Sequence, residues 1–131
     1  MSRYVQVATP ALHGLDVVAE GLAAMGLSVQ RERRRVMLEG SVECSGEPVD
    51  LRLPAGTLDT VEDFGFVQGP EGLQLVCGEL DRALLEERLL PPLQAVVAEQ
   101  KLRGAAERAG MEIESTTEAD GRRRLVVRRR G

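Results

Sequence analysis

The segment from Phe64 to Cys77 constrains the fold more than any other part of the sequence. Two runs of strand-forming residues, 64–67 and 73–77, flank a short turn that contains two glycines and a proline. This arrangement predicts a β-hairpin. We expect the hairpin to lie centrally in a sheet, with Phe64 and Phe66 on one face and directed into the core, because alternate residues of a strand share a face.

Other segments predict the remaining strands. Residues 3–8 alternate polar and apolar side chains, and residues 49–53 do the same, as expected for half-buried strands. Residues 27–39 are predicted to be extended, with the charged run 31–35 at the surface. Residues 111–115 and 125–127 predict two final strands joined at Asp120-Gly121, which is a strong turn signal.

Apolar residues at helical spacing predict a helix over about residues 13–25, ended by Gly26. Asp81 is the predicted N-cap of a second helix. Pro91-Pro92 should end that helix and begin a third, because proline disrupts a helix interior but suits a first turn. The expected inner stripe of the third helix is Ala95, Ala98, Leu102, Ala105 and Ala109.

The predicted element order is β-α-β-β-β-β-α-α-β-β. This order indicates an α+β fold with a mostly antiparallel sheet and helices packed on one face. The chain has 131 residues, and 43% of them are hydrophobic. That length favours one α+β domain over residues 1–131, with a core large enough to fold without disulfides or metals.

Composition excludes several classes of protein. No apolar run approaches the roughly 20 residues that a membrane-spanning helix needs. The first residues lack the apolar block of a signal peptide, so we expect a cytoplasmic protein with no membrane partner. Cys44 and Cys77 are far apart, and only His13 could join them as a soft ligand, so a zinc site with about four ligands is not expected. Reduced thiols are the simpler interpretation.

Charge is distributed unevenly along the chain. The net charge is −4, but residues 41–99 carry three basic and twelve acidic side chains, whereas residues 100–131 carry nine basic and five acidic ones. An acidic middle and a basic end indicate an interaction with a partner or with the protein itself.

Several short motifs resemble one known family. They include Gly26-Leu27-Ser28-Val29 after the first helix, Asp63-Phe64-Gly65-Phe66, Gly72 in the hairpin, Asp81 before the second helix, and Asp120-Gly121 before an arginine-rich strand. Together they resemble the hypothetical chloroplast reading frame thirty-five family of plastids, cyanobacteria and other bacteria, a domain of unknown function. The resemblance implies no established activity. It does imply that related genes often lie near a gene for an AAA-type ATPase, which is a hint of a shared complex and no more.

An acidic cluster is the first candidate site. If residues 64–77 form a hairpin, Asp63, Glu79 and Asp81 meet at its open end. Carboxylates that converge at a helix start could hold Mg²⁺ or Ca²⁺. The alternative is that Asp81 caps the helix, Asp63 binds a turn amide and the glutamates face water. No ligand-loop spacing supports a metal, so we predict no tight divalent site.

The arginine-rich end is the second candidate site. Six arginines lie between Arg122 and Arg130. Strand alternation places Arg124, Arg128 and Arg130 on one face. Three interpretations stay open: a charged edge strand that blocks aggregation, a surface that docks onto an acidic protein, and a contact with nucleic-acid phosphates. The acidic chain and its two phenylalanines, one tyrosine and no tryptophan disfavour the third.

No constellation supports catalysis. Asp63-Phe64-Gly65 matches the metal-binding triplet of kinases, but the chain has no glycine-rich loop or catalytic loop to accompany it. His13 has no serine or cysteine at a spacing that would make a nucleophile pair, and we expect it to have a surface or capping role. We therefore expect no enzyme and no cofactor. The expected function is an adaptor or binding module, with an AAA-type ATPase as the implied partner; a nucleic-acid-binding accessory protein is the alternative.

Overall fold

Three α-helices and eight strands form within residues 3–40 and 46–129, which are the residues that the computed structural model describes. Every strand pair in these residues is antiparallel, which confirms the predicted α+β class. The chain divides into two compact units, Met1–Val97 and Ala98–Gly131, called here the N-terminal and the C-terminal unit. The prediction of one domain over residues 1–131 stays a prediction.

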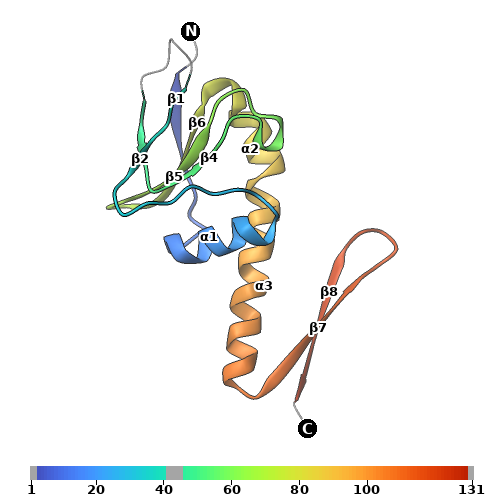
Figure 1. The fold of residues 1–131 in the computed structure, drawn as a ribbon. Helices are drawn as coiled ribbons and strands as arrows, with labels where there is room; N and C mark the ends of the chain where they lie inside the picture. Colours follow the sequence, from blue (N-terminus) through green and yellow to red (C-terminus); the bar gives the residue numbers. More distant parts are fainter. Residues whose placement is uncertain (1–2, 41–45, 130–131) are drawn as a thin grey trace. The chain divides into compact units, whose positions relative to one another are not determined.

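The main sheet of the N-terminal unit is built around the predicted hairpin. Strands β5 (Phe64–Gly69) and β6 (Gly72–Gly78) pair from Gly65 opposite Val76 to Gly69 opposite Gly72 and occupy the two central positions. Strand β1 (Tyr4–Ala8) pairs with β6, and β4 (Leu51–Leu53) pairs with β5, which gives the order β1-β6-β5-β4 (Figure 1). The prediction of a central hairpin is therefore confirmed.

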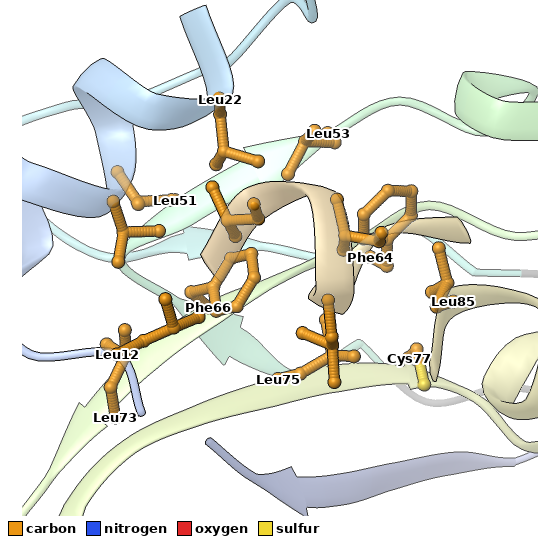
Figure 2. Close-up of a cluster of buried hydrophobic side chains, with 14 of the residues drawn as sticks. Leu12, Leu22, Leu51, Leu53, Phe64, Phe66, Leu73, Leu75, Cys77 and Leu85 are labelled. Carbon is orange, nitrogen blue, oxygen red and sulfur yellow. The ribbon is translucent and has the colours of Figure 1, made fainter. Parts of the chain in front are cut away.

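One face of this sheet carries the principal core. Phe64 and Phe66 are both fully buried, as the alternation predicted. They pack with leucines from β4 and β6 and with leucines and valines from all three helices (Figure 2). The helices therefore cover this one face. The buried members of the cluster are Leu12, Val18, Leu22, Leu51, Leu53, Phe64, Phe66, Leu73, Leu75, Cys77, Leu85, Leu89, Leu90, Leu93 and Val97.

A smaller group of residues packs on the other face of β5 and β6. Strands β2 (Val36–Met37) and β3 (Pro48–Val49) form a two-stranded sheet of their own. Leu38, Val49, Val67 and Val76 make a second buried cluster there. Val67 and Val76 belong to the central strands, so these strands are buried on both faces. The arginines of segment 31–35 are exposed, as predicted.

Gly65 allows β4 to approach β5 closely. A Cβ atom placed at residue 65 would lie 2.1 Å from the carbonyl oxygen of Leu51 and 3.0 Å from a methyl group of Val49. No real side chain tolerates the shorter distance. The glycine of the Asp63-Phe64-Gly65 triplet is thus explained by strand packing.

Helix α1 (Leu15–Ala24) lies within the predicted range 13–25. It begins after Gly14, whose φ of 88° favours glycine. A Cβ atom at Gly21 would lie 3.0 Å from methyl groups of both Leu93 and Val97. Helix α1 therefore packs tightly against the start of the third helix.

The Pro91-Pro92 pair separates two helices, as predicted. Helix α2 (Arg82–Arg88) ends before Leu89, and α3 (Leu90–Arg108) carries both prolines in its first turn. These prolines cost little there, because the first amides of a helix have no partner within the helix.

The predicted inner stripe of α3 is wrong. Its four alanines and Leu102 are all exposed, and the helix instead buries Leu90, Leu93 and Val97, followed by Ala106. A helix with apolar residues on two sides has two candidate stripes. The larger Leu and Val side chains take the buried side because they remove more apolar surface from water.

The C-terminal unit holds the end of α3 and a two-stranded ribbon. Strands β7 (Met111–Thr117) and β8 (Arg123–Arg129) pair in register from Met111 opposite Arg129 to Thr117 opposite Arg123 (Figure 1). The predicted final strands and their turn at Asp120-Gly121 are confirmed. Among the described residues of this unit only Ala106 is a buried apolar residue.

Candidate functional site

Asp63 is the most heavily bonded carboxylate of the predicted acidic cluster. Its side chain is only 2% exposed. It accepts hydrogen bonds from the Tyr4 hydroxyl, from the backbone amides of Glu39 (2.7 Å) and Gly40 (2.9 Å), and from Nε of Arg52 (2.8 Å). Asp63 therefore joins β1, the chain after β2, and β4 at the start of β5.

The acidity of Asp63 follows from these partners. Burial alone would raise its pKa, because burial disfavours the charged form. The hydrogen bonds from Tyr4, Glu39, Gly40 and Arg52 outweigh burial and hold the pKa of the Asp63 carboxyl below its ordinary value. The carboxylate is thus ionised and fully engaged, which leaves it poorly suited to bind a metal ion.

Asp81 stands at the predicted N-cap position of α2, but its side chain does not cap the helix. The prediction of a side-chain cap is therefore wrong. Asp81 occupies the residue before α2 and ends the short 3-10 helix η2 (Glu79–Asp81), but it makes no side-chain cap. Its carboxylate instead accepts hydrogen bonds from the amides of Val61 and Glu62, both at 2.9 Å. The backbone of Asp81 is helical (φ −90°, ψ −9°), whereas a capping residue usually has an extended backbone.

Glu79, the third member of the cluster, points elsewhere. It forms an exposed ion pair with Arg3 at 3.2 Å. Within residues 3–40 and 46–129, no group of three or more His, Cys, Asp or Glu side chains is arranged to hold a metal ion. The three carboxylates of the predicted cluster thus have separate partners.

Two apolar side chains close in sequence to the hydrogen bonds of Asp81 are exposed to solvent. Val61 is 67% exposed and Leu80 is 76% exposed. The 3-10 helix η1 (Thr57–Asp59) precedes Val61, and its Leu58 and Asp59 have positive φ values of 55° and 66°. Two successive non-glycine residues in this region are strained. The name Val61–Leu80 patch is used below for these two side chains.

The sequence contained no signal for the Val61–Leu80 patch. Both residues are apolar and have charged neighbours, a pattern equally typical of the core. The two hydrogen bonds of Asp81 fix the backbone at Val61 and Glu62, and they join residues about 20 positions apart.

The structure shows how the arginines of β8 are arranged. Arg124 and Arg128 lie on the same face of the ribbon, as predicted, since Arg124 is opposite Thr116 and Arg128 is opposite Glu112. Arg128 also forms an ion pair with Glu114 at 3.3 Å. Arg124 has no ion-pair partner among the described residues. Arg130, the third predicted residue, lies outside the described residues.

The opposite face of the ribbon is mostly apolar. It lies beside two ion pairs that Glu99 of α3 forms with Arg103 and Arg123. Met111, Ile113, Leu125 and Val127 share this face, and Val127 is 47% exposed. Arg123, also on this face, pairs with Glu99 of α3 at 2.6 Å. Neither outer edge of the ribbon has a strand partner among the described residues. The ribbon therefore offers one face with Arg124 and Arg128 beside Glu112 and Glu114, a mostly apolar face that also carries Arg123 and Arg129, and two open edges.

His13 and Cys77 show no arrangement for catalysis. His13 is exposed beside a pocket of about 270 Å³, with Thr9 and Glu71 among the other lining residues. The Thr9 hydroxyl already donates to the Leu73 carbonyl at 2.6 Å. Cys77 is buried, and burial together with the nearby Asp81 charge raises the pKa of its thiol to about 11. Cys44 lies outside the described residues.

Comparison of this chain with protein-family models, with curated proteins and with solved structures found no match. No helix in residues 3–40 and 46–129 is long and apolar enough to cross a membrane.

Proposed function

We propose that this chain is a non-enzymatic binding module that docks through strand β8 onto an acidic surface of another protein. The observation that carries the proposal is the position of Arg124 and Arg128 on one exposed face of a ribbon whose edges are open. A row of guanidinium groups is suited to bind carboxylates, because each presents several donors in a fixed plane.

The composition of the C-terminal unit supports this proposal. A two-stranded ribbon is marginally stable by itself in water, and a unit with one buried alanine has little core to add. Contact with a second surface would bury apolar area that the unit does not bury by itself. Strand β8 carries four arginines and no acidic residue, so a negatively charged surface is the favoured complement.

Glutamates beside the arginines favour protein over nucleic acid. Glu112 lies directly opposite Arg128, and Glu114 pairs with it across the ribbon. These carboxylates would repel a phosphate backbone, whose charges are all negative, whereas an acidic protein surface can still place a basic side chain opposite each of them. Nucleic acid is therefore the alternative that the experiment below must exclude.

The partner class follows from the family resemblance. Membership of the hypothetical chloroplast reading frame thirty-five family is part of this proposal, and that family implies an AAA-type ATPase as the partner. We accordingly propose that the protein is an accessory subunit or adaptor of such an ATPase. The cytoplasmic location expected from the sequence belongs to the same proposal.

Affinity capture from native lysate, followed by quantitative mass spectrometry, tests the proposal. The variant Arg124→Gln/Arg128→Gln should retain the fold, because exposed charges contribute little stability. It should lose at least about tenfold of the captured partner, which corresponds to about 1.4 kcal/mol of binding free energy. Adding Arg130→Gln should deepen the loss.

The matched control is Arg33→Gln/Arg34→Gln, which removes two exposed arginines from another part of the chain. The control should capture as much partner as the wild type. Equal capture by the β8 variant and the wild type would show that the arginines are only a solvated edge. Binding of duplex DNA, with a log–log salt slope of about −0.9 per neutralised phosphate, would favour the nucleic-acid alternative.

A further inference from the structure

We propose that Asp120 is a site of spontaneous isoaspartate formation, and that the native turn of the ribbon restrains this reaction. In isoaspartate the main chain runs through the side-chain carbon atoms of the residue. The proposal concerns only the turn at residues 118–122, so it does not depend on the docking function proposed above.

The sequence supplies the reactive pair of residues. Asp120 is the one aspartate of the chain that a glycine follows, and the chain contains no asparagine. Glycine has no Cβ atom, so the Gly121 amide can attack the preceding side chain with little steric hindrance. Residues 116–124 are all exposed, and water therefore reaches both reacting groups.

The reaction needs no enzyme and no cofactor. The backbone nitrogen of Gly121 attacks Cγ of the protonated Asp120 carboxyl group; the new carbon–nitrogen bond closes a five-membered imide, and one water molecule leaves. A second water molecule then opens the imide. Cleavage between the nitrogen and Cγ restores aspartate, whereas cleavage between the nitrogen and the main-chain carbonyl carbon of Asp120 gives isoaspartate. One water is lost and one is gained, so nothing is oxidised or reduced.

The native turn engages both reacting groups. The Gly121 amide donates a hydrogen bond to the Glu118 carbonyl at 2.9 Å. The Asp120 carboxylate accepts hydrogen bonds from the backbone amide of Arg122 at 3.0 Å and from its Nε at 2.7 Å. These two bonds hold the pKa of the Asp120 carboxyl below its ordinary value, whereas the attack requires the protonated form. The closed turn therefore restrains the nucleophile and the electrophile together.

The ribbon nevertheless opens often enough for the reaction to proceed slowly. A two-stranded ribbon is marginally stable by itself, and Ala106 is the one buried apolar residue among the described residues of the C-terminal unit. Each opening of the turn frees the Gly121 amide and the Asp120 carboxylate at the same time. The rate of isoaspartate formation therefore follows the fraction of molecules in which the turn is open.

Isoaspartate would in turn alter the ribbon. It adds one carbon atom to the main chain inside a turn that the hydrogen bond from the Glu118 amide to the Arg122 carbonyl closes at 2.8 Å. The strands on either side are paired up to Thr117 opposite Arg123. We expect faster hydrogen exchange of the β7 and β8 amides in the modified protein, because the longer turn no longer fits this register.

Timed incubation at neutral pH, in native buffer and in urea, tests the proposal. Trypsin releases residues 109–122, and fragmentation mass spectrometry distinguishes aspartate from isoaspartate in this peptide. We expect isoaspartate at Asp120 in both solutions, formed at least about tenfold more slowly in native buffer, as for a turn that is open at most about one-tenth of the time. Asp59, which is 87% exposed and precedes Thr60, is the internal control and should stay unmodified. Equal rates in the two solutions, or no isoaspartate in urea, would overturn the proposal.

The variant Arg122→Gln separates restraint by the turn from an effect of the local sequence. It removes the hydrogen bond from Nε, so the rate in native buffer should rise about threefold while the rate in urea stays the same. Arg129→Gln, at the other end of the ribbon and opposite Met111, is the matched control and should change neither rate. Equal native rates for the wild type and Arg122→Gln would refute the restraint, and an equal rise in urea would show a sequence effect; either result overturns the proposal.

Discussion

The hydroxyl of Tyr4 donates a hydrogen bond to the carboxylate of Asp63, and so joins the start of β1 to the residue that precedes β5. The same carboxylate also accepts hydrogen bonds from Arg52 and from the backbone amides of Glu39 and Gly40. One buried carboxylate thus ties together four segments that are distant in sequence. Most of the stability predictions below concern this part of the sheet.

Asp63→Asn should be strongly destabilising. The substitution replaces an acceptor of four hydrogen bonds with a group that offers one acceptor oxygen. It also removes the closer of the two carboxylates that pair with Arg52, a side chain that is only 15% exposed. We expect a loss of about 3 kcal/mol in the free energy of unfolding, whereas Tyr4→Phe should cost about 1 kcal/mol. Urea denaturation measures both. The control Asp16→Asn, at an 82% exposed carboxylate paired with Arg31, should change stability by less than about 0.5 kcal/mol.

The contribution of Asp63 should vanish in acid. Its pKa in the folded protein is lower than the ordinary value of 3.8, so folding favours the ionised form. The stabilisation is therefore complete above that ordinary value and is lost as the pH falls through the lower folded value. Unfolding measured for wild type and Asp63→Asn should show a constant gap between about pH 5 and 7 that narrows below about pH 4. A gap that widens in acid would contradict the assignment.

Gly65→Ala should damage the sheet far more than Gly69→Ala. At residue 65 the new methyl group would meet the Leu51 carbonyl oxygen at 2.1 Å, so backbone must move. At residue 69 the nearest heavy atom is 3.5 Å away, an ordinary contact. We expect a loss of about 3 kcal/mol or more for the first variant and less than about 1 kcal/mol for the second. Similar melting temperatures for the two variants would refute the close approach of β4.

Phe64→Ala should cost roughly 3–5 kcal/mol, because the ring is fully buried and its removal leaves a cavity. Val61→Ala, three residues earlier and 67% exposed, is the comparison and should cost less than about 0.5 kcal/mol. Both values come from urea melts. A cost for Phe64→Ala below half a kcal/mol would be incompatible with its position in the core.

The thiol of Cys77 should resist labelling in the folded protein. Its pKa is raised to about 11, so little thiolate exists at about pH 8, and the side chain is also buried. In a Cys44→Ser variant, a thiol reagent should react only as fast as the protein opens, and denaturant should accelerate the reaction. Because the raised pKa favours the protonated thiol, this contribution to stability is complete below the ordinary value of 9.0 and is lost as the pH rises through about 11.

Local patterns predicted the parts of the fold that depend on neighbouring residues. The hairpin followed from two strand-like runs around a glycine- and proline-rich turn, and the break before α3 followed from Pro91-Pro92. Strand alternation also placed Arg124 and Arg128 on one face of β8. In each case the physical cause lies within a few residues, so the sequence alone is sufficient.

Predictions failed where distant residues decide the outcome. Asp81 has the side chain of a helix cap, but the amides of Val61 and Glu62 take its carboxylate. The alanine stripe of α3 has correct helical spacing, but Leu93 and Val97 are the residues that meet Gly21 of α1. On α3 both apolar stripes have helical spacing, so spacing alone does not choose between them. The contacts of Asp81 leave no periodic trace in the sequence. The partners of Asp63 were missed for the same reason.

The pairing of β1 with β6 has a consequence for how the protein is made. The register runs from Tyr4 opposite Gly78 to Ala8 opposite Gln74, so the first strand of this sheet to be synthesised pairs with the last one. At about 5–20 residues per second, β1 has no partner for roughly 4–14 seconds. Throughout that interval the alternating segment Tyr4–Ala8 is an unpaired strand that a chaperone can bind. The speed of translation therefore sets the earliest moment at which this sheet can be complete.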